Sequence, residues 1–396
     1  MVKLQIEIPE EFLKEEVRCG YTISAEMKKV WAVELDMLHL LDTVCKKYGL
    51  RYFADSGTLL GAVRHHGFIP WDDDIDVVMF RDDYEKLKEV AEKEFQHPYF
   101  FQTLYNDEKL IREHAQIRNS ETTGYLPNEE NRPYNKGLFL DIFPLDILPD
   151  DGLKYKIHMA KIKLLWRTIE YGGYVKDAPH ELKGKIFLQG TKLLYKFTDY
   201  KKLFKKYEKL CARYNDSDYD RISYVCFSRG KEKNMFRKEW WDETIDMPFE
   251  FTTIPCPAGY DGRLKQEYKD YMTIKNVPST HINAFGGTIQ SAEKPYGEFI
   301  RDKQEAEGKN PDTAGQSAEG NRPEDVGQSA EGNRPEDAGQ AKADGKISSK
   351  KTSSKKASSK KASSKQEKPE KKSLKAGLKR QKKDGKALLK IRKGKE

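Results

Sequence analysis

The sequence lacks the features that would place the chain in a membrane or among disulfide-stapled secreted proteins. It has no apolar run near the length that spans a bilayer, and no basic start followed by an apolar stretch and a small-residue cleavage site. CxxC pairs are also absent, and the five cysteines are odd in number and widely spaced. These absences argue against a disulfide framework and a zinc site. We therefore expect a cytoplasmic protein with reduced thiols.

Positive charge is concentrated at the C-terminal end of the chain. Residues 346–396 hold 21 Lys or Arg and 4 Asp or Glu, so this segment carries +17 while the whole chain carries +8. The preceding residues are therefore acidic overall, with a net charge of −9. Because nucleic-acid-binding domains present a basic surface, this distribution argues against nucleic acid as the substrate.

Large apolar residues become rare beyond residue 285. The segment GQSAEGNRPED at 315–325 recurs at 327–337, and a Lys/Ser motif recurs every five residues from 350 to 365. Neither repeat has apolar positions that stacking could bury, which excludes a solenoid and favours disorder. The charge of the tail suits a polyanion or the anionic inner face of a membrane, where the protein would be peripheral.

Before residue 285 the pattern is a mixture of helices and strands. Apolar residues at spacings of three and four predict a helix at 24–48 with Gly49 as its C-cap, followed by a strand at 50–54. Further strands are predicted at 115–118 and 137–143, with an amphipathic helix after Asp82. We expect an α+β fold, a mixed sheet flanked by helices. The expected parts are an N-terminal arm at 1–23, a catalytic domain at 24–285 with a helical subdomain at 154–213, a low-complexity linker at 286–345 and a disordered basic tail at 346–396.

Acidic and apolar residues alternate in one short stretch, Asp74-Ile75-Asp76-Val77-Val78-Met79. In a strand the side chains alternate between faces, so Asp74 and Asp76 share one face. The apolar residues at 75, 77 and 79 then point into a core. Two adjacent carboxylates repel each other unless a cation lies between them, and hard oxygen ligands favour Mg²⁺ or Mn²⁺. This strand therefore predicts a divalent metal site.

A turn of small residues precedes the acidic strand. Ser56-Gly57-Thr58 leads into a helical pattern that reaches Arg64. Backbone N–H groups at a helix N-terminus bind phosphate. A phosphate cradle beside a metal site indicates phosphoryl-group transfer.

A single acidic residue, Asp141, interrupts the apolar run at 137–143. A charge inside such a run is costly unless it meets a partner. We therefore expect Asp141 to emerge beside Asp74 and Asp76. There it would be a third metal ligand or the base that activates the acceptor hydroxyl; the alternative is an aspartate that caps a loop at the strand end.

The stretch GTLLGAVRHHGFIPWDDDIDVVM at 57–79 resembles the signature of the LicD-type phosphocholine transferases. That signature is similar to the one of the fukutin-related sugar phosphotransferases, within the nucleotidyltransferase superfamily. The resemblance continues through QIRN at 116–119 and GLFLDIFPLD at 137–146, and it covers roughly residues 24 to 280. It departs at Lys269, where the family commonly has glycine, which leaves the acceptor open.

The resemblance implies a nucleotidyltransferase-like fold and roles for individual residues. Asp72, Asp74 and Asp76 would bind Mg²⁺ or Mn²⁺, with Asp141 at the family's later acidic position. The phosphate-side turn would be formed by Gly57, Thr58 and Gly61. Arg64 and Arg118 are candidates for the donor phosphates, because guanidinium groups pair bidentately with phosphate.

The resemblance implies transfer of phosphocholine, or a similar phospho-alcohol, from a CDP-choline-like donor. The acceptor would be a sugar hydroxyl of a cell-surface glycan or lipid-linked glycan, such as a lipopolysaccharide or teichoic acid precursor. Two alternatives remain open. One is a nucleotidyltransferase that adds a nucleoside monophosphate to a small acceptor and releases pyrophosphate. The other is a non-catalytic scaffold that acts through its basic tail.

Overall fold

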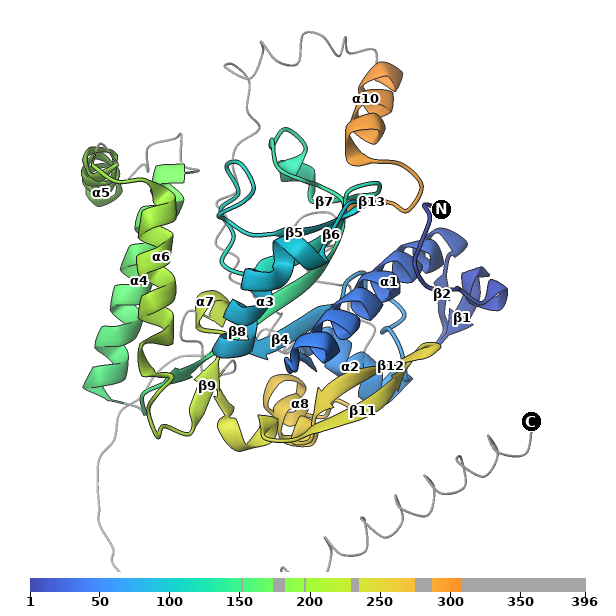
Figure 1. Cartoon of the computed structure of the whole chain (residues 1–396), viewed down its shortest axis with the longest axis horizontal. Helices are drawn as coiled ribbons and strands as arrows, with labels where there is room; N and C mark the ends of the chain where they lie inside the picture. Colours follow the sequence, from blue (N-terminus) through green and yellow to red (C-terminus); the bar gives the residue numbers. More distant parts are fainter. Residues whose placement is uncertain (151, 174–181, 196, 229–234, 275–286, 308–396) are drawn as a thin grey trace, which may run out of the picture. The chain divides into compact units, whose positions relative to one another are not determined.

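The computed structural model describes residues 1–150, 152–173, 182–195, 197–228, 235–274 and 287–307 (Figure 1). The predicted basic tail at 346–396 and the repeats at 315–337 lie outside the described residues. Among the described helices, none combines the length and the apolar character needed to cross a membrane.

Helices and strands alternate along the described chain. The helices are α1 (Ala25–Tyr48), α2 (Ser56–His65), α3 (Arg81–Glu94), α4 (Leu153–Gly173), α5 (Leu182–Leu194), α6 (Tyr200–Cys211), α7 (Val225–Ser228), α8 (Tyr260–Tyr268) and α10 (Tyr296–Ala306). The strands are β1 (Glu16–Arg18), β2 (Tyr21–Ile23), β3 (Phe53–Ala54), β4 (Asp76–Phe80), β5 (Tyr99–Gln102), β6 (Ala115–Asn119), β7 (Thr123–Tyr125), β8 (Leu138–Leu148), β9 (Arg221–Ser223), β10 (Phe236–Arg237), β11 (Thr244–Phe249), β12 (Thr252–Pro257) and β13 (Ile289–Ser291). This composition confirms the α+β class.

The long strand β8 is the centre of the main sheet. It pairs parallel with β4 and antiparallel with β6 and β9, in the order β10-β9-β8-β4-β3 with β5 and β6 branching from β8. The parallel register sets Asp76 opposite Asp141. The sheet is therefore mixed, as predicted, and its one parallel pair joins the two predicted acidic segments.

The first helix begins and ends where the sequence predicts. Ser24 is the N-cap of α1, and its Oγ accepts a hydrogen bond from the Met27 backbone N–H at 3.2 Å. Gly49 ends the helix in the left-handed conformation, with φ +66°, which favours glycine. These local signals confirm the predicted helix.

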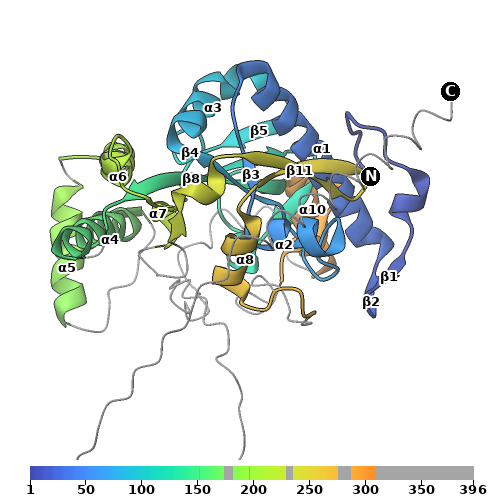
Figure 2. The ribbon, with the colours of Figure 1, turned by 90° about the horizontal axis from the view of Figure 1, so that it is seen from below.

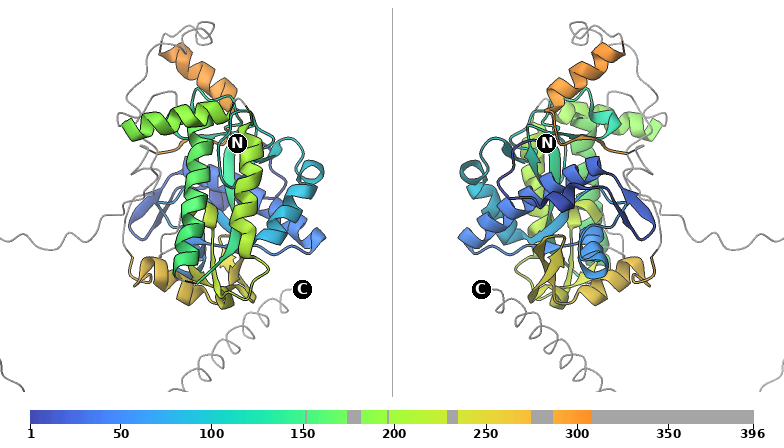
Figure 3. Two further views of the ribbon diagram at one scale, coloured as in Figure 1. Left: turned by 90° about the vertical axis from the view of Figure 1, so that its left-hand side faces the viewer. Right: turned by 90° about the vertical axis from the view of Figure 1, so that its right-hand side faces the viewer.

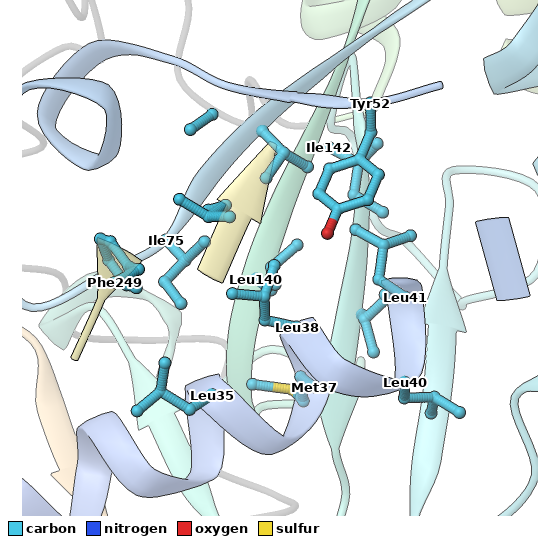
Figure 4. Close-up of a cluster of buried hydrophobic side chains, with 14 of the residues drawn as sticks. Leu35, Met37, Leu38, Leu40, Leu41, Tyr52, Ile75, Leu140, Ile142 and Phe249 are labelled. Atoms are coloured by element: carbon cyan, nitrogen blue, oxygen red, sulfur yellow. The ribbon is translucent and has the colours of Figure 1, made fainter. Parts of the chain in front are cut away.

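The main hydrophobic core lies between α1 and the sheet. Figure 2 shows α1 and α3 on one side of β4 and β8, with α2 and α8 on the other. In the close-up of Figure 4, Ile75 and Leu140 lie toward Leu38 of α1. Ile75, Val77 and Met79 are all fully buried, which confirms the predicted direction of the apolar side chains around β4.

A second core lies at the C-terminal end of β8, where α4 and α6 pack side by side (Figure 3). Trp166 of α4 and Phe204 of α6 are buried there, whereas Leu193 and Leu194 of α5 are 57% and 40% exposed. Their apolar character therefore does not mark a side that packs on the core.

Two predicted domain boundaries need correction. Residues 289–306 were assigned to the linker, but they form β13, which pairs with β7, and α10. The N-terminal arm also joins the fold, because Val2 N–H donates to the Ala292 carbonyl and two backbone N–H groups of the arm donate to Asp36 Oδ1. Such pairing between segments that are distant in sequence depends on tertiary contacts, which composition does not reveal.

Candidate metal centre and active site

Three aspartates from two strands meet at one place. Asp74, Asp76 and Asp141 each offer a carboxylate oxygen, and these oxygens lie within 4.8 Å of one another. Asp74 lies just before β4, and Asp76 is the first residue of that strand. The register of β4 on β8 brings Asp141 to the pair, as the sequence analysis predicts. A compact set of oxygen ligands of this kind fits a hard divalent cation.

A second group of carboxylates shares Asp74. Oxygens of Asp72, Asp73 and Asp74 also lie within 4.8 Å of one another. Asp73 is buried, and its Oδ2 accepts a hydrogen bond from Thr288 Oγ1 at 2.8 Å. The structure thus extends the predicted metal residues into one acidic cluster, which we define as Asp72, Asp73, Asp74, Asp76 and Asp141.

The turn before α2 holds the start of β4 in place. Thr58 Oγ1 accepts the Asp76 backbone N–H at 2.8 Å, and the Asp55 N–H donates to the Asp76 carbonyl. Both backbone groups of Asp76 are therefore tied to the same turn. Ser56 adopts a left-handed conformation with φ +46°, which is uncommon for a residue with a side chain. The predicted phosphate-side residue Thr58 is buried and positions Asp76, a predicted metal ligand.

Gly57 lies against the acidic cluster. A Cβ atom at this position would come within 2.5 Å of Asp72 Oδ2, closer than van der Waals contact allows. The missing side chain therefore provides the room that the Asp72 carboxylate occupies. This contact links the glycine of the predicted turn directly to a predicted metal ligand.

A buried ion-pair network holds the turn before α2 in place. Asp55, the N-cap residue of α2, pairs with Arg263 Nε at 2.7 Å, and Arg263 Nη1 pairs with Glu267 at 2.7 Å. Arg263 and Asp55 are both almost completely buried. Removing one partner of such a network leaves an uncompensated buried charge, which strongly destabilises a fold. The turn is therefore fixed by α8, an element distant in sequence.

His114 and Gln116 hold the Asp141 carboxylate. His114 Nε2 lies 3.0 Å from Asp141 Oδ1, and Gln116 Nε2 donates to the same oxygen at 2.5 Å. Burial lowers the pKa of His114, so the ring is neutral near pH 7 and donates from Nε2. Burial alone would raise the pKa of Asp141, but His114, Arg112 and Gln116 outweigh it and lower that pKa below its usual value. Asp141 is therefore ionised.

Two arginines fix the orientation of the Gln116 amide. Arg118 Nη2 donates to Gln116 Oε1 at 2.6 Å, and Arg112 Nη1 donates to the same oxygen. Because the oxygen accepts from both arginines, the amide NH₂ group must face Asp141. Gln116 belongs to the matching run QIRN, but no local pattern in the sequence marks His114 or Arg112 as site residues.

The predicted role of Arg118 in binding donor phosphates needs correction. Its side chain is 1% exposed, and its guanidinium donates to Gln102 and to the carbonyls of Gly124 and Gly137 as well as to Gln116. Burial lowers its pKa to about 10, which still leaves it charged near pH 7. Arg118 shares one face of β6 with the polar residue Gln116, so the local pattern gives no signal of this burial. Arg118 acts on the site through Gln116.

The structure does not bring Gly61 and Arg64 to the acidic cluster. Gly61 lies inside α2, where a Cβ would come within 2.4 Å of the Gly67 carbonyl, so its role is close packing of the following loop. Arg64 lies near the opposite end of α2 from Ser56, about 12 Å along the helix axis at 1.5 Å per residue. Its Nη1 donates to the Tyr271 carbonyl at 2.7 Å. Their contacts with the donor phosphates therefore stay a prediction.

Glu34 of α1 was missed by the sequence analysis. It is 1% exposed, and its Oε2 has no hydrogen-bond partner among the described residues. Burial, and next the charges of Asp74 and Asp73, raise the pKa of this carboxyl well above its usual value. A charged residue between Trp31 and Leu38, on the buried stripe of an amphipathic helix, is the signal that could have revealed it.

The segment that builds this site matches a known protein family. A family model described as LicD/FKTN/FKRP, nucleotidyltransferase domain, matches residues 49–161, which contain the Ser56 turn and all five aspartates of the acidic cluster. The lipopolysaccharide cholinephosphotransferase LicD of Haemophilus influenzae is 28% identical over 252 residues, 61% of this chain and 89% of the relative. Residues 49–161 are therefore similar to the LicD/FKTN/FKRP family, and a larger part of the chain is similar to one LicD protein.

The chain also has shorter matches to two uncharacterized rickettsial proteins. The protein of Rickettsia prowazekii is 48% identical over 44 residues, which are 11% of this chain and 16% of the relative. The protein of Rickettsia typhi is 54% identical over 44 residues, 11% of this chain and 14% of the relative. These two matches add a similarity over a short segment and no activity.

Proposed function

We propose that this LicD-type chain transfers phosphocholine, or a similar phospho-alcohol, from a CDP-activated donor to a sugar hydroxyl. The similarity to a named cholinephosphotransferase supports a phosphotransferase activity for this chain. The relative from Haemophilus influenzae is named for phosphocholine transfer and for lipopolysaccharide. By that similarity the acceptor is a cell-surface glycan precursor, such as one for lipopolysaccharide or teichoic acid.

The observation that supports this proposal best is the meeting of Asp74, Asp76 and Asp141 from two parallel-paired segments. These three aspartates, together with Asp72, would hold Mg²⁺ or Mn²⁺. A bound cation supplies charge neutralisation at the donor phosphates during in-line attack.

Two groups of residues position the aspartates of the acidic cluster. Thr58 and the turn at Ser56 fix the backbone of Asp76, and His114 and Gln116 orient Asp141. A carboxylate that stays ionised in a buried site is a good cation ligand and a weak base. We therefore favour Asp141 as a metal ligand over Asp141 as the general base.

The start of α2 suits the donor phosphates. Its first turn lies beside the acidic cluster, because the Gly57 Cα is adjacent to Asp72. A helix N-terminus attracts anions through its backbone N–H groups and its dipole. The donor pyrophosphate would thus lie between the turn at Ser56 and the cation that the carboxylates hold.

The experiment that tests this function identifies the products. Purified protein is incubated with CDP-choline labelled in the choline and, separately, in the cytidine, together with a lipopolysaccharide or teichoic acid precursor. Release of CMP with choline label on the glycan supports the proposal. The family description also names a nucleotidyltransferase domain, which makes nucleotidyl transfer the second candidate. Release of pyrophosphate from CTP with label transferred as CMP would replace the first proposal by the second.

A further inference from the structure

Helix α4 is apolar on the side that faces away from the core. Its buried side chains include Ile162 and Trp166, which pack into the second core. Leu153, Ile157 and Leu164 are nevertheless 74%, 46% and 58% exposed. Large apolar side chains that gather on an exposed helix face indicate an interaction surface. We call these three residues the α4 stripe.

The α4 stripe is narrow and flanked by positive charge. At 100° per residue, its three side chains fall within about 40° of one another, opposite the buried side of the helix. Lys154 and Lys161 lie along one edge of the stripe, and Lys156, Lys163 and Arg167 lie along the other. Between residues 153 and 171 the sequence has five Lys or Arg and one acidic residue, Glu170. This arrangement is typical of helices that lie in the plane of a membrane surface.

A basic cavity opens beside the stripe. It has a volume of about 140 Å³ and is lined by Lys154, Ile157, His158, Lys161, Arg213 and Tyr214. His158 is 3% exposed, and its Nε2 has no hydrogen-bond partner among the described residues. Lys154 is held in place by a hydrogen bond from its Nζ to the Tyr219 hydroxyl at 2.6 Å. The cavity therefore combines three cations with a buried polar nitrogen, which suits a phosphate group.

Helix α5 repeats the pattern. Leu188 and Thr191 are buried, while Ile186 and Leu193 are 65% and 57% exposed on the opposite side. Phe197, just beyond the helix, is 81% exposed. Two neighbouring helices therefore carry outward apolar residues.

We propose that the α4 stripe docks onto an anionic phospholipid bilayer and that the basic cavity takes the phosphate of a lipid headgroup. Apolar side chains enter the interface, while lysines on both edges meet anionic headgroups. The charge distribution favours a bilayer over an acidic protein as the partner, because the lysines and the arginine flank an apolar stripe on both sides. This docking does not depend on the proposed reaction.

The test uses the full-length chain in flotation with vesicles of phosphatidylcholine alone and of phosphatidylcholine with phosphatidylglycerol. The stripe variant is Leu153→Gln/Ile157→Gln/Leu164→Gln, and the cavity variant is Lys161→Glu/Arg213→Glu. Val17→Gln/Met272→Gln is the matched apolar control, because Val17 and Met272 are 69% and 56% exposed elsewhere. Lys93→Glu/Lys109→Glu is the matched charge control. Flotation is repeated at high salt, which screens purely electrostatic binding by the basic tail.

We expect the wild type to bind the anionic vesicles, and a part of this binding to persist at high salt. In the stripe variant the binding that persists at high salt should be weaker by about tenfold or more. The variant lacks three apolar side chains that would enter the bilayer interface. The cavity variant should lose the preference for phosphatidylglycerol, while both controls bind as the wild type does. Circular dichroism checks that each variant folds.

Two results would overturn the proposal. One is flotation of the stripe variant at high salt to the same extent as the wild type. The basic tail would then account for the vesicle binding. The other is saturable binding of inorganic phosphate at the cavity, lost in the cavity variant, with no vesicle binding that depends on the stripe. That second result would make the cavity a site for a soluble phosphate. Neither result bears on phosphocholine transfer to a soluble acceptor, which is measured separately.

Discussion

Asp76 and Asp141 lie opposite each other on the parallel strands β4 and β8, with carboxylate oxygens within 4.8 Å. Parallel pairing gives each strand the same direction, so the two carboxylates emerge at the same edge of the sheet. Like charges at this separation repel and are tolerated when a cation or hydrogen-bond donors compensate them. His114 and Gln116 supply hydrogen-bond donors to Asp141, and we propose that a bound metal ion also offsets the charge of the cluster.

Gly57→Ala tests the approach of the turn to Asp72. The added methyl group would meet Asp72 Oδ2 at 2.5 Å, so the carboxylate must move and transfer activity should fall about tenfold or more. The unfolding free energy should change little, because the helix preference for Ala over Gly, about 1 kcal/mol, offsets the cost of the close contact with Asp72. Enzyme kinetics and urea denaturation measure the two effects. Gly190→Ala, in open space on α5, is the control and should leave activity unchanged.

Gln116→Leu tests the support of Asp141. Loss of the amide removes a donor to the metal-binding carboxylate, and such supporting contacts typically affect activity or metal affinity by about 10- to 100-fold. We expect a lower kcat and a higher Mg²⁺ concentration for half-maximal activity. Gln96→Leu is the control, because Gln96 is an exposed residue that donates to the Glu92 carbonyl. An unchanged Mg²⁺ requirement in Gln116→Leu would remove Gln116 from the site.

The sequence predicts the local parts of this structure well. Ser24 and Gly49 delimit α1 because caps act within one turn of the helix. The burial of Ile75, Val77 and Met79 follows from alternation along the chain. Such features depend on neighbouring residues, so a pattern in one stretch is enough to predict them.

Contacts between distant segments could not be predicted in the same way. The hydrogen bonds from His114 to Asp141 and the pairing of Asp55 with Arg263 depend on which strands and helices meet. The partners of Arg118 cannot be predicted from its residue type alone, because a guanidinium group binds phosphate and also donates to buried carbonyls. Without the strand register, the sequence offers no means of choosing between these partners.

Arg81→Met tests the buried ion pair that fastens α3 to β8. Arg81 donates to both Asp146 oxygens, at 2.9 and 2.6 Å, and both side chains are buried. Removing the arginine leaves a buried carboxylate, which should cost about 3–5 kcal/mol of unfolding free energy. Urea denaturation measures this loss. Lys86→Met breaks an exposed pair with Glu89 on the same helix and should cost about 1 kcal/mol or less. Equal costs for the two variants would contradict the account.

Glu16→Gln tests a contribution to stability that depends on pH. The hydrogen bond from Arg18 lowers the pKa of Glu16 from its usual 4.5 to about 2. A carboxyl with a lowered pKa stabilises the fold above its unfolded pKa, and this stabilisation is lost as the pH falls toward the folded pKa. The Tm difference between wild type and variant should therefore be largest near pH 7 and shrink from about pH 4.5 downward. A Tm difference that grows on acidification would contradict this sign; Glu11→Gln is the control for an exposed pair.

The central claim is that the acidic cluster binds the cation that supports transfer. The most direct measurement is choline-label transfer from CDP-choline by the wild type and by Asp76→Asn, titrated with Mg²⁺ to saturation and repeated with EDTA. We predict that EDTA abolishes wild-type transfer, and that Asp76→Asn loses about 10³-fold or more even at saturating Mg²⁺. Near-normal transfer by Asp76→Asn, or full wild-type activity in EDTA, would contradict the account.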